Sequence, residues 1–286
     1  MKKILVTGAN GQLGQCLQKI SSQFEEFEFI FTDSEILDIT NKEEVNDFFW
    51  QNAPDFCINA AAYTAVDLAE TEVEKAFLVN ADGAENLAEA CAENNAQFIH
   101  VSTDYVFDGE NNLAYTEEDF TNPLGVYGAS KLAGDELALE VNPCSVILRT
   151  SWVYSEFGKN FVKTMLNLFA TKEELSIVAD QFGQPTNAND LAEAIMKIIK
   201  SEKITPGIFN FSNLGRISWF DFAEKIAELS EAKIKLNAIE TSQYPTPAKR
   251  PKNSVLDLDK ISKTYAIQLK PWEESLEDCV QILQNN

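Results

Sequence analysis

Gly8-Ala-Asn-Gly11-Gln-Leu-Gly14 follows directly on a short apolar run at the start of the chain, and this junction decides the fold. The apolar run is typical of a buried strand, and the residues after the last glycine have the three- and four-residue spacing of a helix. Glycines at such a turn let the backbone approach a ligand, and the helix N-terminus offers free N–H groups to a phosphate. The junction therefore predicts a dinucleotide site. A glycine-rich turn without a ligand is the alternative for this motif alone.

The rest of the first half repeats the alternation of strand and helix patterns. Short β-branched or aromatic runs predict strands at 3–7, 28–32, 56–59, 97–102 and 145–151. Helical periodicity between them predicts helices at 13–22, 42–52, 73–94 and 131–140. Such repetition implies a parallel sheet with helices on both faces. We expect an α/β protein with a Rossmann-type, doubly wound parallel sheet.

The pattern changes after residue 152 and predicts a smaller C-terminal α/β lobe that binds the substrate. Helices are expected at 160–170, 189–201, 218–230 and 272–283, and strands at 208–211 and 233–239. Residues 244–251 are proline-dense and cannot be helical. We assign 1–151 to the dinucleotide domain and 152–286 mostly to the substrate lobe, with 185–215 returning to the first domain.

Composition narrows the class of partner and the compartment. With 23 Lys and Arg against 45 Asp and Glu, the net charge is −22, which argues against nucleic acid. No apolar stretch approaches the length of a membrane span. Five scattered cysteines with no Cys-x-x-Cys pair indicate thiols in a reducing cytoplasm. The single histidine leaves little material for a metal site, and none is assigned.

Tyr127-Gly-Ala-Ser-Lys131, with Ser102-Thr103 upstream, supplies the chemistry. A tyrosine and a lysine four residues apart share one helix face, so the ammonium can favour the phenolate. Tyr127 would protonate a carbonyl oxygen, and Thr103 would offer a hydroxyl to the same oxygen. Tyr-x-x-x-Lys alone is more often a solvated helix face, but the glycine turn and Thr103 together favour carbonyl reduction with NAD(P)H. His100, inside the preceding strand, is expected to lie in the core or behind the site.

Asp33 follows the second strand, where a carboxylate can accept hydrogen bonds from the adenosine ribose. Its neighbour is Ser34, and no arginine is near, so a 2′-phosphate would meet a carboxylate without a counter-charge. The sequence therefore favours NADH over NADPH. Asp38 and Ile39 are expected to flank the adenine.

Longer strings of sequence resemble the dTDP-4-dehydrorhamnose reductase family of the extended short-chain dehydrogenase/reductases. They are Asn59-Ala-Ala-Ala-Tyr-Thr-Ala-Val-Asp-Leu-Ala-Glu70, Ser102-Thr-Asp-Tyr-Val-Phe-Asp-Gly109, Pro123-Leu-Gly-Val-Tyr-Gly-Ala-Ser-Lys-Leu-Ala-Gly134, Arg149-Thr-Ser-Trp-Val-Tyr154, Asp180-Gln-Phe-Gly-Gln-Pro-Thr186 and Arg250-Pro-Lys-Asn-Ser-Val-Leu-Asp257. The resemblance runs from Met1 to the final helix. It implies reduction of the 4-keto group of dTDP-4-dehydro-L-rhamnose to dTDP-L-rhamnose, with hydride from the nicotinamide and the proton from Tyr127.

The resemblance also implies roles for individual residues. The catalytic set would be Thr103, Tyr127 and Lys131. The cofactor would be bound by Gly8, Gly11, Gln12, Leu13, Gly14, Asp33, Asp38, Ile39, Ala61, Ala62, Tyr63, Thr64, Tyr127 and Lys131. The dTDP-sugar would be bound by Val66, Thr103, Asp104, Trp152 and Arg250. Family members use NADH, NADPH or both, and some use Mg²⁺ at a homodimer interface, for which no ligands are assigned here.

Two alternatives stay open at this point. One is another sugar-nucleotide enzyme of the short-chain type, such as an epimerase, although epimerases are usually longer and lack the Thr-Asp-Tyr-Val-Phe string. The other is a non-catalytic regulatory subunit of the same fold, against which an intact Thr103, Tyr127 and Lys131 argue. The sequence does not decide cofactor preference, oligomeric state or the glycan supplied.

Overall fold

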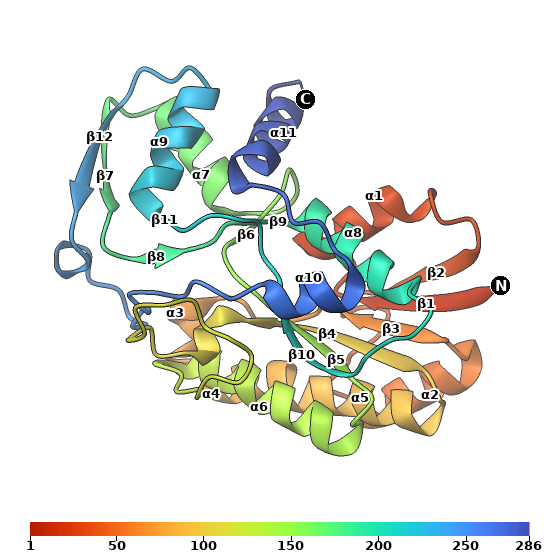
Figure 1. The fold of residues 1–286 in the computed structure, drawn as a ribbon. Coiled ribbons are helices and arrows are strands. Elements are labelled where there is room, and N and C mark those ends of the chain that lie inside the picture. Colours follow the sequence, from red (N-terminus) through yellow and green to blue (C-terminus); the bar gives the residue numbers. More distant parts are fainter. Residues whose placement is uncertain (286) are drawn as a thin grey trace.

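A central sheet of six parallel strands forms the body of the molecule in the computed structural model, which describes residues 1–285 (Figure 1). The strands, in their order across the sheet, are β10 (Gly207–Asn210), β5 (Val146–Thr150), β4 (Gln97–Thr103), β3 (Phe56–Asn59), β1 (Lys2–Thr7) and β2 (Phe27–Phe31). This confirms the predicted doubly wound sheet. The late strand expected at 208–211 is β10, and it lies at the edge beside β5.

Helices cover both faces of the sheet because successive strand residues point to opposite sides. Ile4 and Val6 pack into the layer beneath α1 (Gln12–Ser21) and α8 (Ala188–Ile199). Leu5 packs into the opposite layer. That second layer is covered by α2 (Lys42–Asn52), α5 (Gly83–Glu93) and α6 (Val126–Val141) (Figure 1). Both faces of the sheet are therefore shielded from water, as its continuous apolar strands require.

The helix predicted at 73–94 is interrupted. It consists of α4 (Val73–Phe77), one turn of π-helix (Leu78–Asp82) and α5, and it is preceded by the short α3 (Val66–Ala69). The Asn80 side chain in the π turn accepts the Tyr63 N–H at 2.8 Å and donates to Ser130 Oγ at 3.0 Å. A π turn changes the direction of side chains within a helix, and here it ties the loop after β3 to α6.

A smaller lobe lies beyond the carboxyl ends of the strands (Figure 1). It contains α7 (Phe161–Phe169), α9 (Trp219–Leu229), α11 (Trp272–Gln284) and a parallel pair of strands, β7 (Glu174–Val178) and β12 (Lys235–Ile239). Two further pairs, β6 (Val153–Tyr154) with β9 (Thr186–Asn187) and β8 (Phe182–Gly183) with β11 (Ile217–Ser218), connect it to the body. Tyr154, Phe222 and Leu276 belong to its core.

The elements that were not expected from the sequence include β7 and α10 (Asp259–Tyr265). The strand β7 pairs with β12, some sixty positions away along the chain, and its local pattern is weak. The helix α10 leaves the smaller lobe and packs on the sheet, where Ile261 and Tyr265 join the core beneath α8. The division into 1–151 and 152–286 stays a prediction.

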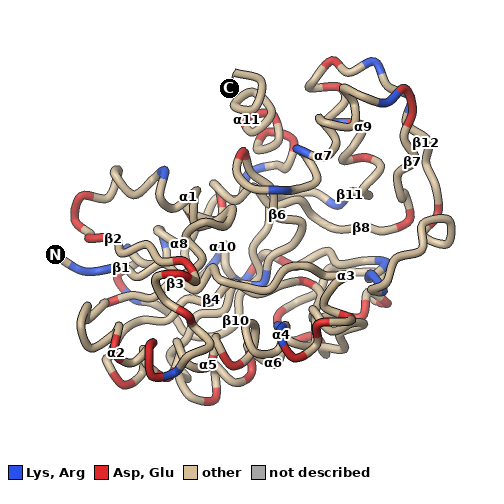
Figure 2. The backbone as a smooth tube through the Cα atoms, turned by 180° about the vertical axis from the view of Figure 1, so that it is seen from behind, with Lys and Arg blue, Asp and Glu red and all other residues tan. Residues whose placement is uncertain are grey.

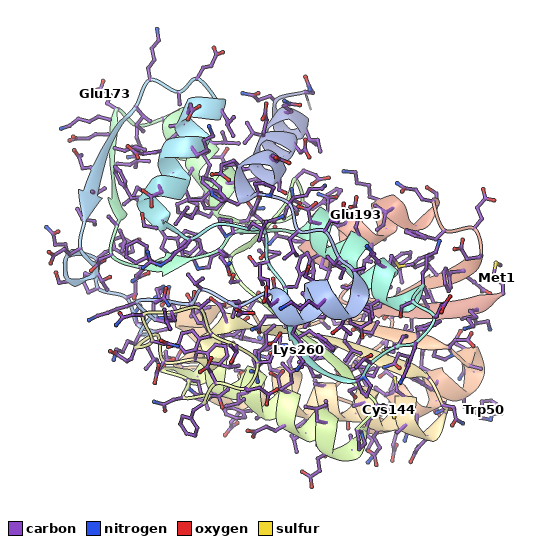
Figure 3. The ribbon with its side chains drawn as sticks, in the orientation of Figure 1. Met1, Trp50, Cys144, Glu173, Glu193 and Lys260 are labelled. Carbon is purple, nitrogen blue, oxygen red and sulfur yellow. The ribbon has the colours of Figure 1, made fainter. Side chains whose placement is uncertain are left out.

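Acidic residues are spread over the surface of the molecule, on both the sheet body and the smaller lobe (Figure 2). Four cysteines are buried, whereas Cys144 is exposed at the body surface (Figure 3). Among residues 1–285, no helix combines the length and apolarity needed to cross a membrane.

Candidate active site

The glycine turn between β1 and α1 is set by close packing of backbone on backbone. Gly8 has φ +67°, and a Cβ there would lie 2.6 Å from Ala61 N. A Cβ on Gly14 would lie 2.5 Å from Ala9 Cα. Any side chain at either position would push the turn away from its neighbours. The first turn of α1 begins at Gln12 with no side chain capping it, so its N–H groups are available to a phosphate.

A hollow beside this turn brings together half of the predicted cofactor residues. Among its lining residues are Gly8, Gly11, Asp33, Asp38, Ile39, Ala61 and Ala62. Asp33 accepts a hydrogen bond from the Asn10 amide at 2.5 Å and from the backbone N–H of Glu35 at 3.0 Å. The lining includes Glu35 and no lysine or arginine from the described chain. These residues fit the adenosine and pyrophosphate of a dinucleotide.

Other predicted cofactor residues do not line that hollow. The Gln12 amide donates to Val153 O at 3.3 Å and accepts from Asn160 Nδ2 at 2.8 Å, so its side chain joins α1 to the smaller lobe. Leu13 is buried in the core. Tyr63 donates its hydroxyl to Glu72 at 3.0 Å, and Thr64 lies in the same loop. Motif matching cannot separate a side chain that bridges two lobes from one that contacts a ligand.

Tyr127 lies in the first turn of α6, at the carboxyl end of β4. Its phenol lies beside the Thr103 side chain. Thr103 ends β4 and donates to Asp104 Oδ1 at 3.1 Å. Burial raises the pKa of Tyr127 to about 12, and the neighbouring Thr103 hydroxyl opposes that shift. The phenol is therefore protonated at neutral pH and placed to give its proton to an oxygen held beside Thr103.

Lys131 lies one turn further along α6 and is only 1 % exposed. Its Nζ is 2.7 Å from Val101 O and 3.1 Å from His100 Nε2. Burial lowers the pKa of Lys131 to about 8, with Asp135 opposing. In this conformation the Lys131 ammonium does not contribute to the shift in the pKa of Tyr127. Lowering of the tyrosine pKa by Lys131 stays a prediction for the enzyme with cofactor bound.

A buried polar cluster behind Lys131 was only partly expected. His100 is fully buried, as predicted, and its Nδ1 is 3.0 Å from Asn59 Nδ2. Asp135 is also buried and accepts from Arg149 Nε at 3.1 Å. The spacing of Asp135, four residues after Lys131, was the signal that could have identified it.

The predicted substrate residues fall into two groups. Val66 and Tyr127 line one hollow together with Ala248, Lys249 and Pro251 of the proline-rich loop. Trp152, with φ +46°, stacks on Trp219 at 3.6 Å between ring centroids, outside that hollow. A bulky residue at positive φ is strained, which marks Trp152 as held in place for a reason other than local preference.

Arg250 and Asp104 also adjoin this region. The Arg250 guanidinium makes a bidentate pair with Asp67, at 2.8 and 3.0 Å. Asp104 is 2 % exposed and its Oδ2 has no partner among the described residues. Burial raises the pKa of Asp104 to about 7. An unpartnered buried carboxyl oxygen beside Thr103 suits a ligand hydroxyl.

The Mg²⁺ that the resemblance implies at a homodimer interface stays a prediction. Over residues 1–285, no three His, Cys, Asp or Glu side chains group in a way that could hold a metal ion. No step of the chemistry is assigned to a metal.

The parallel sheet, the glycine turn and the joined Thr103, Tyr127 and Lys131 define a dinucleotide-dependent oxidoreductase of the short-chain type. Comparisons with known proteins narrow this class. The family model described as RmlD substrate binding domain matches residues 1–285. A dTDP-4-dehydrorhamnose reductase from Aggregatibacter actinomycetemcomitans is 46% identical, covering 97% of this chain and 98% of its own. The chain therefore belongs to the dTDP-4-dehydrorhamnose reductase family.

Solved structures agree with this assignment. A crystal structure of a dTDP-4-dehydrorhamnose reductase from Clostridium acetobutylicum superimposes with a TM-score of 0.94 at 43% identity, covering 99% of both chains. A second, from Bacillus anthracis and in complex with NADP, gives 0.95 at 40% identity and covers 99% of this chain and 100% of its own.

Proposed function

We propose that the chain catalyses the NAD(P)H-dependent reduction of the 4-keto group of dTDP-4-dehydro-L-rhamnose to dTDP-L-rhamnose. The observation that carries this proposal is the position of the Tyr127 phenol beside the Thr103 side chain, because it places a proton donor at the carboxyl end of the sheet. The hollow around the glycine turn accommodates part of a dinucleotide, and the small hollow containing Val66 adjoins Tyr127, where a second ligand would approach.

Thr103, Tyr127 and Lys131 have separate roles in this reaction. When bound, NAD(P)H supplies the hydride. Thr103 holds the substrate oxygen by a hydrogen bond, and Tyr127 gives that oxygen its proton as negative charge develops on it. Lys131 holds the cofactor ribose and stabilises the phenolate that Tyr127 leaves behind.

We further propose that the sugar nucleotide is bound from the smaller-lobe side. Asp104 and Thr103 contact the sugar, Val66 and Trp152 supply apolar surface, and Arg250 meets the diphosphate. Arg250 is part-buried and carries a planar fork of donors, which suits a phosphate as well as it suits Asp67. On binding, the substrate diphosphate would replace Asp67 as the partner of this arginine.

For the cofactor, the hollow favours NADH. A 2′-phosphate would enter among Asp33, Ser34 and Glu35 with no lysine or arginine in the lining. The NADP complex of the Bacillus anthracis relative shows that family members bind the phosphorylated form. The ratio of kcat/KM for NADH and NADPH decides the matter, and Asp33→Ala with Ser34→Arg should move that ratio toward NADPH.

One assay tests the function against its alternatives. The purified chain is supplied with the dTDP-4-keto sugar and each reduced cofactor, and the product is identified by mass and NMR. A 4-hydroxyl product with loss of cofactor absorbance at 340 nm, the nicotinamide wavelength, supports the reductase. Redistribution of stereochemistry without net oxidation of cofactor indicates an epimerase. Cofactor binding without turnover indicates a regulatory subunit. A homodimer stays a prediction.

A further inference from the structure

The amide of Asn59 has only one orientation that satisfies its neighbours. Its Oδ1 is 3.1 Å from the backbone N of Ala61 and 2.7 Å from Thr7 Oγ1. A backbone N–H can only donate, so the carbonyl oxygen of the amide must face Ala61. The amide nitrogen therefore faces His100 Nδ1 at 3.0 Å. Because that nitrogen is a donor, Nδ1 of His100 must be the acceptor.

This bond fixes the tautomer of the imidazole. A neutral imidazole carries one N–H, and with Nδ1 accepting, the hydrogen is on Nε2. Burial holds the pKa of His100 well below its usual value, so the ring stays neutral. Nε2–H then faces Lys131 Nζ at 3.1 Å. An ammonium has three donors and no lone pair, so only the neutral amine of Lys131 can accept this hydrogen bond.

The other groups around Lys131 are consistent with a neutral amine. From β4, Val101 O accepts a hydrogen from Nζ at 2.7 Å, which the neutral amine can still supply. From α6, the carboxylate of Asp135 faces it, and Arg149 of β5 pairs with Oδ2 of that carboxylate at 3.1 Å. Its Oδ1 lies 3.9 Å from His100 Nε2, beyond hydrogen-bond distance, so the amine at 3.1 Å is the nearer partner of Nε2–H. Tyr127 of α6 is protonated. The arginine therefore compensates the one negative charge in the cluster without a second cation.

We propose that His100 is a positioning residue that holds Lys131 as a neutral, retracted amine before cofactor binds, and that Lys131 takes up a proton from solvent as it engages the cofactor. This inference rests on the proposed function, since it concerns the same lysine. Once charged, the ammonium and Nε2–H would present donor to donor, so protonation and departure from His100 occur together. At a pH above about 8, where the free lysine is neutral, His100 thus makes its charge conditional on an occupied site.

Calorimetry of NADH binding tests the proton uptake directly. With the pKa of free Lys131 near 8, binding at about pH 9 should take up close to one proton, and at about pH 6.5 close to none. The number of protons follows from the slope of binding enthalpy against buffer ionisation enthalpy. Binding at about pH 9 with no dependence on the buffer would overturn the proposal.

Two variants separate His100 from general effects of mutation. In His100→Gln, the amide carbonyl can turn toward Lys131 and accept from the ammonium, so uptake at high pH should fall close to zero and the alkaline limb of the kcat/KM profile should move upward. Ser145→Ala removes a buried hydroxyl just before β5 that bonds Asn142 O at 2.7 Å and should keep the wild-type uptake. Equal uptake in all three proteins would also overturn the proposal.

A second measurement needs neither a variant nor a ligand. His100 is the only histidine, so its two ¹⁵N imidazole signals are unambiguous in the labelled protein. We expect the neutral Nε2–H form across the pH range from about 6.5 to about 9. A Nδ1–H tautomer or an imidazolium would contradict the proposal. If neither NADH nor NADPH binds, the proposed function fails, and the imidazole signals still decide how His100 faces Lys131.

Discussion

Tyr127 is the single residue on which the chemistry depends most. Its phenol lies beside Thr103 and stays protonated, so it is placed to protonate the substrate oxygen. Tyr127→Phe keeps the ring and removes only the proton, and kcat should fall by ~10²–10⁴-fold. The Kd for NADH should change little.

Tyr105 provides the matched control. Its ring lies edge-on to that of Tyr127, with 5.7 Å between the ring centroids. Burial keeps its phenol protonated as well. Its backbone N–H donates to Thr103 Oγ1, but its hydroxyl bonds neither Thr103 nor Asp104. Tyr105→Phe should retain most of kcat. Near-normal turnover by Tyr127→Phe would remove that phenol from the mechanism.

A second residue-scale prediction concerns the pair of Arg250 and Asp67. If the guanidinium is shared between Asp67 and the substrate diphosphate, Arg250→Ala should raise KM for the dTDP-sugar roughly tenfold or more, as loss of a charge-assisted pair does. Asp67→Asn should lower the same KM, because the competing carboxylate is gone. The Kd for NADH should stay constant in both variants.

The two substitutions thus move KM in opposite directions under this proposal. If Arg250 serves only to hold Asp67 and the Ala248 loop, both should raise KM alike, since each breaks the same pair. Steady-state kinetics at fixed saturating NADH distinguish the two outcomes. A fall in NADH affinity with unchanged KM would place the loop on the cofactor side.

At the scale of elements, α9 offers a measurable test of local sequence. Ser218 accepts from the Asp221 N–H at 3.1 Å, while Asp221 accepts from the Ser218 N–H at 2.8 Å, a complete capping box. Ser218→Ala should lower the free energy of unfolding by about 1 kcal/mol. Chemical denaturation measures it, and Ser242→Ala, on the exposed turn before Tyr244, is the control. Equal stability of the two variants would show that the cap contributes nothing.

Elements with strong local patterns were predictable, and those fixed by distant contacts were not. The helix Lys42–Asn52 and the strand Phe56–Asn59 were predicted to the residue because their periodicity and caps are local. The strand Glu174–Val178 depends on pairing with β12, and the π turn depends on Asn80 meeting α6. Neither dependence is visible in a local window.

The same distinction explains the site. Spacing predicted that Tyr127 and Lys131 share a helix face, and both do lie on α6. Spacing could not predict where the Lys131 amine points, because His100 and Val101 reach it from β4. Likewise, nothing near Gln12 in sequence indicates Asn160 as its partner. Side-chain direction in a crowded site is set by neighbours brought in by the fold.

On the scale of the whole molecule, the net charge of −22 opposes compaction. Acidic positions are spread over both lobes (Figure 2), and many ion pairs are exposed, such as Lys235 with Glu174. Exposed pairs contribute little, so repulsion among the remaining carboxylates dominates the long-range electrostatics. Salt shortens the screening length from about 30 Å at 0.01 M to about 8 Å at 0.15 M.

Added NaCl over that range should therefore raise Tm by a few degrees, because it weakens repulsion in the folded state more than it weakens short-range pairs. Scanning calorimetry at neutral pH measures the shift. KCl at the same ionic strength should give the same shift, which separates screening from binding of a particular cation. A fall in Tm with salt would mean that local pairs such as Arg250 with Asp67 outweigh the repulsion, and that the acidic surface does not strain the fold.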